Sequence, residues 1–304
     1  MRPVHSFPAR GDCVFRRGRR RCGAIVKLTE RLLPHLARVA TLLVLFALGA
    51  LLAVILQRGA GALTWEMVST PPAGGFYLGG GGGIGNAIVG SLLMAGSATI
   101  AAVLLGFPVA LLLQQGLLTP RCASGCRLVF DILQGIPSLI YGVFGFTVLL
   151  LTGMRASLAA GAATLALLEL PLVVRAFDEA LRAVPAALPA AARALGASRL
   201  QALLAVSCRQ ALPGFAAGVI LAFGRGIGDA AAVLFTAGFS DAVPLAPGDP
   251  AATLPVAVFT LASSHIPRVQ DRAYAAAAVL LLIVLALSAL TRFAAHRLGR
   301  YRLP

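Results

Sequence analysis

The chain has 304 residues, of which 59% are hydrophobic and only 12% are charged, and its formal net charge is +15 at pH 7. Soluble domains carry about 25% charged residues, so this composition excludes an ordinary globular protein and indicates an integral membrane protein. The positive charge does not indicate nucleic-acid binding, because the Lys and Arg residues gather in alternate segments between the apolar stretches, as membrane orientation requires.

Stretches long and apolar enough to cross a bilayer as helices, at about 20 residues each, recur along the chain. They are residues 39–56, 84–113, 127–151, 156–174, 214–235 and 273–291. The predicted fold class is therefore all-α, a polytopic membrane helix bundle with about six transmembrane helices. The predicted organisation is a basic N-terminal tail (1–38), a first transmembrane helix (39–56), a transmembrane domain (84–293) containing a cytoplasmic loop (178–213), and a basic C-terminal tail (294–304).

The Lys and Arg residues predict the orientation. Twenty-one of the 26 lie in alternate segments between the spans, beginning with the N-terminal tail; four lie in the intervening segments, and Arg225 lies inside the fifth span. Cytoplasmic segments carry the Lys/Arg excess, so both termini are predicted to be cytoplasmic. All five cysteines fall on the same side, where thiols stay reduced: Cys13, Cys22, Cys122, Cys126 and Cys208. They lack the partners of a four-ligand site, so no metal site is predicted.

Segments 57–83 and 236–272 are predicted to lie outside the cell. The first is rich in Gly and Pro and ends in GGGGG at 79–83, which predicts a flexible loop. It has no nucleotide-binding spacing, and Lys27, the single lysine, follows no glycine loop, so the chain contains no P-loop. If ATP powers a process in which this chain takes part, another chain must hydrolyse it. In the second segment, 253–264 (TLPVAVFTLASS) is apolar but short, and we expect it to be interfacial or re-entrant.

The cytoplasmic stretch at 179–204 reads EALRAVPAALPAAARALGASRLQALL. Its helix-prone run from 190 to 206 is broken once, at Gly196, which permits a tight turn between two short helices. Such a small-faced helix pair suits a groove on another protein, although a solvated amphipathic loop fits the residues equally well.

The stretch resembles the EAA loop of ABC importer permeases, which docks into a cleft of the ATPase subunit. Around it, NAIVGSLLMAG at 86–96, GIPSLIYGVFG at 135–145, LPGFAAGVILAFGRGIGDAAAVLFTAG at 212–238 and TLPVAVF at 253–259 resemble, in order, phosphate permease subunits of the PstA type. The resemblance runs from about residue 84 to the C-terminus. It implies the type I (MetI-like) importer architecture.

The resemblance also has departures. When the loops are aligned on Gly196, the family's glutamate falls on Ala190, with Ala191 and Ala192 retained. The Leu-Pro that usually follows the loop falls on Cys208 and Arg209. The family's Glu-Thr after GRxIG is here Asp229-Ala230.

The family implies residues that couple the bundle to the ATPase, namely Glu179, Ala190, Ala191, Ala192, Leu195, Gly196, Ala197 and Arg199. Candidates for the substrate path are Arg225, Asp229, Glu169, Ser138 and Tyr141, because charges inside spans are costly and are usually functional or paired. The guanidinium of Arg225 matches the geometry of an oxyanion. Alternatively Arg225 and Asp229, four residues apart, neutralise each other on one helix face, or Glu169 pairs with Arg225 across the bundle. Asp131 and Arg175 are further charges in or beside spans, and Arg175 is expected to reach the cytoplasmic interface.

The resemblance implies a non-enzymatic permease subunit in a bacterial inner membrane that imports inorganic phosphate. It has no catalytic residue and no cofactor of its own, since ATP is used by a partner. The implied partners are a second related permease, a cytoplasmic ATPase dimer, a periplasmic phosphate-binding protein and membrane lipid. Import of molybdate or sulfate is an alternative. A self-sufficient secondary transporter or an intramembrane enzyme is a third reading, against which the absence of a convincing internal repeat counts.

Overall fold

The computed structural model describes residues 12–114 and 118–299, with side chains described for 33–114 and 118–293. The thiols of Cys13 and Cys22, and most of the two basic tails, lie outside these described side chains. The chain forms two compact units, Met1–Val54 and Ile55–Pro304.

The first unit consists of most of helix α1 (Asp12–Ala62). Its membrane-span candidate, Leu33–Ala62, contains the predicted span 39–56, and Phe46 is 79% exposed. The mean hydropathy of this candidate span is 2.9. An exposed helix this apolar requires a lipid or protein environment, because water would solvate its side chains poorly.

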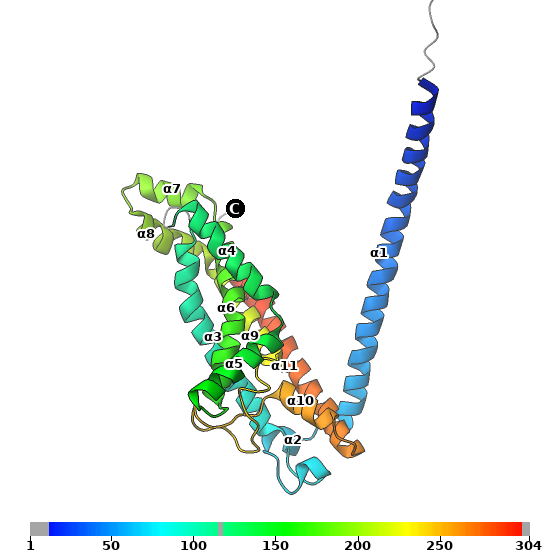
Figure 1. Ribbon diagram of the computed structural model, residues 1–304, viewed down its shortest axis with the longest axis vertical. Helices are drawn as coiled ribbons and strands as arrows, with labels where there is room; N and C mark the ends of the chain where they lie inside the picture. The colour runs from blue at the N-terminus through cyan, green and yellow to red at the C-terminus, as the bar shows by residue number, and fades with distance from the viewer. Residues whose placement is uncertain (1–11, 115–117, 300–304) are drawn as a thin grey trace, which may run out of the picture. The chain divides into compact units, whose positions relative to one another are not determined.

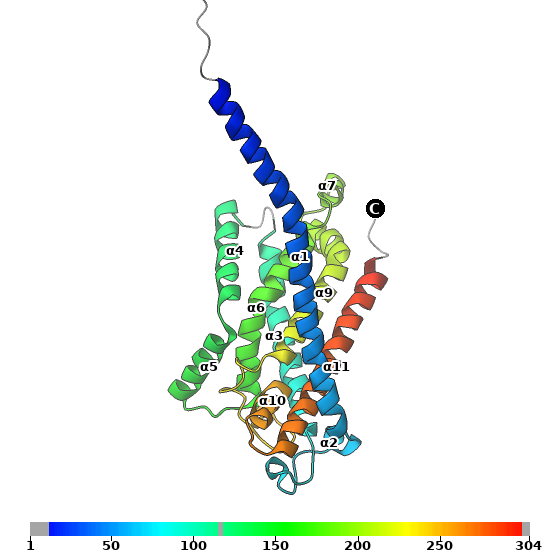
Figure 2. The same ribbon diagram turned by 90° about the vertical axis from the view of Figure 1, so that its right-hand side faces the viewer.

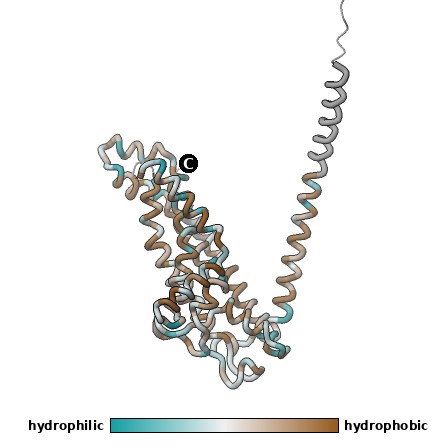
Figure 3. Tube along the Cα trace, viewed as in Figure 1, coloured by the Kyte–Doolittle hydropathy of each residue, from teal (hydrophilic) through white to brown (hydrophobic). Residues whose placement is uncertain are grey.

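The second unit is built on long helices that pack against one another along most of their lengths (Figure 1). These are α3 (Gly85–Leu112), α6 (Leu158–Arg182), α9 (Cys208–Gly228) and α11 (Pro267–Gly299). Hydrophobic residues predominate along them, as Figure 3 shows. The predicted spans 84–113, 156–174 and 273–291 are confirmed as apolar helices, and α6 and α11 extend further than predicted.

Small and aromatic residues set the packing of α3, α6 and α9. A Cβ on Gly106 of α3 would lie 3.0 Å from Val173 of α6, so the two helices approach as closely as a glycine permits. Nearer the ends of the same helices, Phe107, Phe177 and Phe215 form a cluster with ring centroids 4.7–6.1 Å apart. These contacts fix the position at which α6 leaves the bundle.

Shorter elements lie at the two ends of this unit (Figures 1 and 2). One end holds α7 (Ala187–Ala194), α8 (Arg199–Gln201), the π-helical turn η2 (Ala202–Ser207) and the C-terminal end of α11. The other end holds α2 (Trp65–Ser69), the 3-10 turn η1 (Phe76–Leu78) and α10 (Leu254–Ala262).

The predicted third span, 127–151, is not one continuous helix. It is divided into α4 (Pro120–Gly135) and α5 (Ser138–Thr152), which meet at an angle of 94°. Pro137 lies at the break, and residues before a proline avoid helical geometry. The Tyr141 hydroxyl donates a hydrogen bond to the carbonyl of Leu133 at 2.8 Å and so bridges the bend.

The predicted fifth span, 214–235, is also corrected. Helix α9 begins earlier, at Cys208, and ends at Gly228. Asp229 has extended backbone angles, and residues 231–236 form turns that return the chain into the bundle. The buried side chains of Val233 and Ala237 account for the apolar continuation that suggested a longer helix.

The glycine run at 79–83 is packed, which corrects the expectation of a flexible loop. A Cβ on Gly80 or Gly83 would collide with the backbone of Gly74 or Met67. Arg272 of α11 donates hydrogen bonds to the carbonyls of Phe76, at 2.6 Å, and Gly80.

The two outward-predicted loops are joined to each other. The Tyr77 hydroxyl donates a hydrogen bond to Asp241 at 2.8 Å. Burial, together with the hydrogen bond and charge of Asp241, raises the pKa of Tyr77 above its ordinary value. Asn86 donates a hydrogen bond to the carbonyl of Ser240 at 2.6 Å, which makes this end of the unit one connected structure.

Candidate functional site

Residues 183–207, here called the docking segment, connect α6 to α9 at one end of the second unit. Gly196 has a φ of 95°, a conformation that favours glycine, and it makes the turn between α7 and α8. Ser198 and Gln201 form a capping box that starts α8. A turn at Gly196 and a short helix before it are therefore confirmed, but the second short helix is not: α8 continues through η2 into α9 as one helical stretch, Arg199–Gly228.

The docking segment exposes apolar side chains. Leu195 is 90% exposed, and Leu200 and Leu204 are about half exposed, while α7 has no buried residue. Among the predicted coupling residues, Glu179, Ala190, Ala191, Leu195, Gly196 and Arg199 are exposed, and Ala192 and Ala197 are half-buried. Exposed leucines grouped on a short helix pair mark an interaction surface.

Arg225 lies on an exposed face of α9, about 25 Å along the helix from its start at Cys208. Ser138 is half-buried three residues before Tyr141 on α5, and the contacts described for it do not join it to Arg225. Within the described residues, no ion pair joins Arg225 to Glu169 or Asp229.

Asp229 does not share a helix face with Arg225, because α9 ends between them. Its Oδ1 accepts a hydrogen bond from the backbone N–H of Ala232 at 2.9 Å. Asp229 therefore caps the turn that follows α9, and the predicted neutralisation within one helix is wrong.

Glu169 is completely buried between α3, α6 and α9. Its Oε2 accepts a hydrogen bond from the Thr99 hydroxyl at 2.8 Å, and its Oε1 has no hydrogen-bond partner. A Cβ on Gly226 would collide with that Oε1, so α9 presents a glycine where the carboxylate lies. Glu169 thus joins helices instead of facing the exposed side of Arg225.

A cavity of about 10 Å³ lies beside these residues, with Ser91, Asp229 and Thr253 among its polar lining. That volume admits about one water molecule and is too small for a phosphate. Arg225 is exposed on α9 and does not line this cavity.

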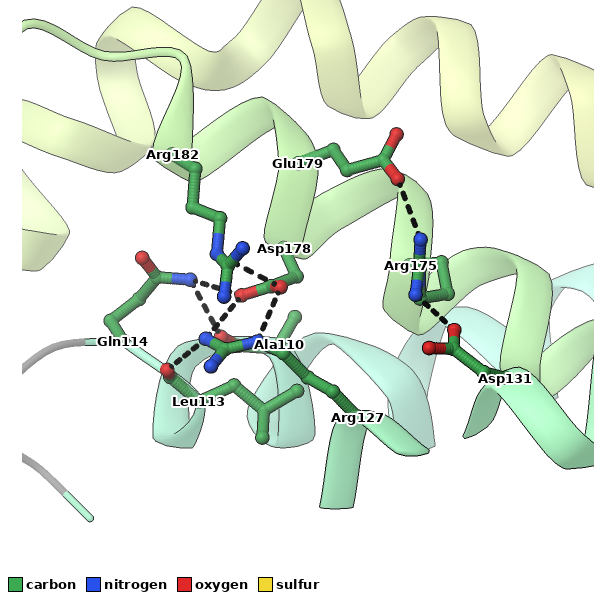
Figure 4. Close-up of polar contacts among 9 residues, drawn as sticks. All are labelled: Ala110, Leu113, Gln114, Arg127, Asp131, Arg175, Asp178, Glu179 and Arg182. Carbon is green, nitrogen blue, oxygen red and sulfur yellow. Dashed lines mark hydrogen bonds and ion pairs between the residues drawn. The ribbon is translucent and has the colours of Figure 1, made fainter. Parts of the chain in front are cut away.

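A second polar group lies at the docking end, on α4 and α6 (Figure 4). Asp178 is 4% exposed and accepts contacts from Arg127, Gln114 and Arg182. Beside it, Arg175 forms ion pairs with Asp131 and, at 3.1 Å, with Glu179. The predicted interface cation Arg175 is thus paired between two helices.

Sequence reasoning did not select Asp178, Arg127 or Gln114. The signal that could have found Asp178 is an acidic residue with arginines three positions before it and four after it, at the end of an apolar helix. Arg127 and Gln114 carry no comparable signal, because their contact depends on how α3 and α4 pack.

Comparisons with known proteins show the family and the fold. Residues 102–300 match the family model described as binding-protein-dependent transport system inner membrane component. The phosphate transport system permease protein PstA of Haemophilus influenzae is 33% identical over 268 residues, covering 88% of this chain and 93% of that protein. PstA 1 of Mycobacterium tuberculosis is 35% identical over 230 residues, covering 73% of each. An inward-facing structure of the MetNI methionine ABC transporter shares the fold, with a TM-score of 0.56 and 19% identity over 69% of this chain and 93% of that one.

Proposed function

Because this chain belongs to the family of binding-protein-dependent transport system inner membrane components, we propose that it is a permease subunit of an ATP-driven importer of inorganic phosphate. Membership makes it a multi-pass membrane transport component and not an enzyme. The observation that carries the proposed substrate is the similarity, over most of the chain, to permeases named for phosphate transport.

The proposed energy source is a separate ATPase that binds the docking segment. The exposed Leu195, on a turn held by Gly196 and by the capping box, supports this role, since a rigid apolar projection fits a cleft on a partner. ATP-driven closure of two ATPase copies would move the docking segment and switch the bundle between outward-open and inward-open states.

The proposed substrate path lies between this chain and a second, related permease. Arg225 supports that position because it is a charge on an exposed face of a membrane-spanning helix, where lipid alone would be a costly neighbour. The second permease would complete the path, and a phosphate-binding protein would deliver the anion to the end of the unit that carries α2 and α10.

The proposed orientation places both termini and the docking segment in the cytoplasm of a bacterial cell. The excess of Lys and Arg in those segments supports it. Within the second unit, the docking segment and the C-terminal end of α11 lie at one end, as that orientation requires (Figure 1).

Uptake by a reconstituted complex tests the substrate. The chain would be purified with its permease and ATPase partners, placed in proteoliposomes containing ATP, and supplied with the binding protein and labelled phosphate. We expect ATP-dependent uptake that unlabelled phosphate suppresses and equal concentrations of sulfate or molybdate do not. Uptake that sulfate or molybdate suppresses as well as phosphate does would reject phosphate as the specific substrate.

A further inference from the structure

The carboxylate of Asp178 is shared by three elements of the second unit (Figure 4). Arg127 of α4 binds it with both arms of its fork, Nε to Oδ2 at 2.8 Å and Nη2 to Oδ1 at 3.1 Å. Gln114, after the end of α3, donates to Oδ1 at 3.0 Å, and Arg182 of α6 lies 3.2 Å from Oδ2. A carboxylate this deeply buried depends on such partners, because an unpaired charge there is costly.

The same side chains terminate α3. Arg127 donates a third hydrogen bond, to the carbonyl of Leu113 at 2.6 Å, and Gln114 donates to the carbonyl of Ala110 at 3.2 Å. The last carbonyls of a helix have no partner within it, so these contacts satisfy groups that would otherwise need water. Asp178 holds both donors in place and thereby connects the end of α3 to α4 and α6.

The apolar contacts of α4 at this end are mostly partly buried. Only Leu113, Ala123 and Val174 are fully buried there, and the residues packed against them are Val109, Leu118, Cys126, Phe130 and Leu170. On its remaining surface Leu128 and Ile132 are each 60% exposed. The contact of Arg127 with Asp178 is the most deeply buried ion pair that joins α4 to α6 in the described residues.

Asp178 also lies one turn before the docking segment. Helix α6 ends at Arg182, and Arg182 reaches back four residues to the same carboxylate that holds Arg127. A tilt at the end of α6 therefore moves the carboxylate, and with it Arg127 and α4.

We propose that Asp178 is a positioning residue that makes α4 move with the docking segment, so that work done by the ATPase reaches the α4–α5 part of the bundle. This inference rests on the proposed function. The pair Arg175–Asp131 joins the same two helices, but its side chains are 33% and 45% exposed, and an ion pair with that exposure contributes little. Asp131 is therefore the matched control.

The test compares Asp178→Asn with Asp131→Asn in the assembled, reconstituted complex. Asn keeps the shape of the side chain and removes its charge. For Asp178→Asn we expect the number of ATP molecules hydrolysed per phosphate imported to rise on the order of fivefold or more, with ATP hydrolysis retained. Asp131→Asn is expected to stay close to the parent. Equal ratios in the parent and in Asp178→Asn, or equal effects of the two variants, would overturn the proposal.

A second measurement does not depend on the substrate. Spin labels on Cys122 of α4 and on a Leu195→Cys variant, with the other four cysteines replaced by alanine, report the distance between α4 and the docking segment. We expect one narrow distribution in the parent and in Asp131→Asn, and a widened one in Asp178→Asn. If the parent imports no phosphate, the proposed function fails while this distribution still tests the connection.

If the complex with Asp178→Asn does not assemble, the Arg127→Lys variant tests the proposal instead. Lysine keeps the charge but loses the two-armed contact and the bond to Leu113. We expect it to raise the hydrolysis-to-uptake ratio and widen the distance distribution in the same direction. Parent-like values in both measurements would overturn the proposal.

Discussion

Arg225 is the residue on which anion recognition depends in this picture. Its planar guanidinium can bind a phosphate with two parallel hydrogen bonds, and its position on the exposed face of α9 leaves those donors available to a ligand. Glu169 and Asp229 have structural contacts instead, with Thr99 and with the turn after α9.

Replacing Arg225 by glutamine removes the charge and keeps most of the side-chain length. We expect Arg225→Gln to lower phosphate uptake by at least about tenfold, since a lost charge-assisted hydrogen-bond pair costs on the order of 1.5–3 kcal/mol. The amount of assembled complex should be unchanged, because the side chain is exposed. Arg155→Gln, an exposed arginine in the loop before α6, serves as control. Normal uptake by Arg225→Gln in cells lacking other phosphate systems would reject the assignment.

Gly226 offers a prediction about stability. A methyl group at this position collides with the buried Oε1 of Glu169, whereas a methyl group at Gly224, on the same helix, meets nothing within 4 Å. We expect Gly226→Ala to destabilise the protein by about 1–3 kcal/mol through overpacking. Gly224→Ala should be neutral or slightly stabilising, since alanine favours helices. Thermal unfolding in detergent measures both, and equal midpoints would contradict the packing at Glu169.

For single residues, the sequence predicted the features that follow from residue type. It did not predict the features that depend on where a helix ends. The turn at Gly196 could be predicted, because a glycine within a helix-prone run permits a tight turn. The separation of Arg225 and Asp229 could not be predicted. Helix α9 ends at Gly228, between these two residues, whereas the apolar sequence continues beyond it. Asp178 acquires its role from α3 and α4, which are distant in sequence.

Among the elements, the docking segment was predictable in outline. The break at Gly196 indicated a turn between two short helices; the structure has the turn and the first short helix, whereas the second is the start of the helical stretch Arg199–Gly228. The π-helical turn η2 was not foreseen, because its residues, ALLAVS, are also good α-helix formers. Similarly, residues 127–151 were predicted as one span, and the 94° angle between α4 and α5 depends on their packing against α6.

Leu195 should govern attachment of the ATPase. We expect Leu195→Asp to weaken binding of the ATPase subunit by at least about tenfold, because it places a charge where an apolar side chain would enter a cleft. The stability of the chain itself should not change, since Leu195 is 90% exposed. Co-purification at graded detergent and salt concentrations measures the effect.

Leu245 is the matched control for that measurement. It is 92% exposed but lies in the loop between α9 and α10, away from the docking segment. Leu245→Asp should leave ATPase binding as it is in the parent. A similar loss of binding in both variants would show that the effect comes from general perturbation and not from docking.

For the whole molecule, composition alone predicted the class, and periodic apolar stretches predicted most of the bundle. The number of spans was the least well determined feature of the predicted fold. The described residues contain five helices long and apolar enough to cross a membrane, or six spans if α4 and α5 together form one. The path for the substrate could not be located from one sequence. It depends on which face of α9 stays uncovered, and that is a property of the packed bundle.

The orientation of the second unit determines whether a cytoplasmic ATPase can drive it at all. Single cysteines replacing Leu195 and Leu245, in a chain whose own cysteines are changed to alanine, would be exposed to a membrane-impermeant thiol reagent in intact cells. We expect the cysteine at 245 to be labelled from outside and the cysteine at 195 to be labelled only after the cells are opened. Labelling of position 195 in intact cells would place the docking segment outside and contradict energy transfer from an ATPase through it.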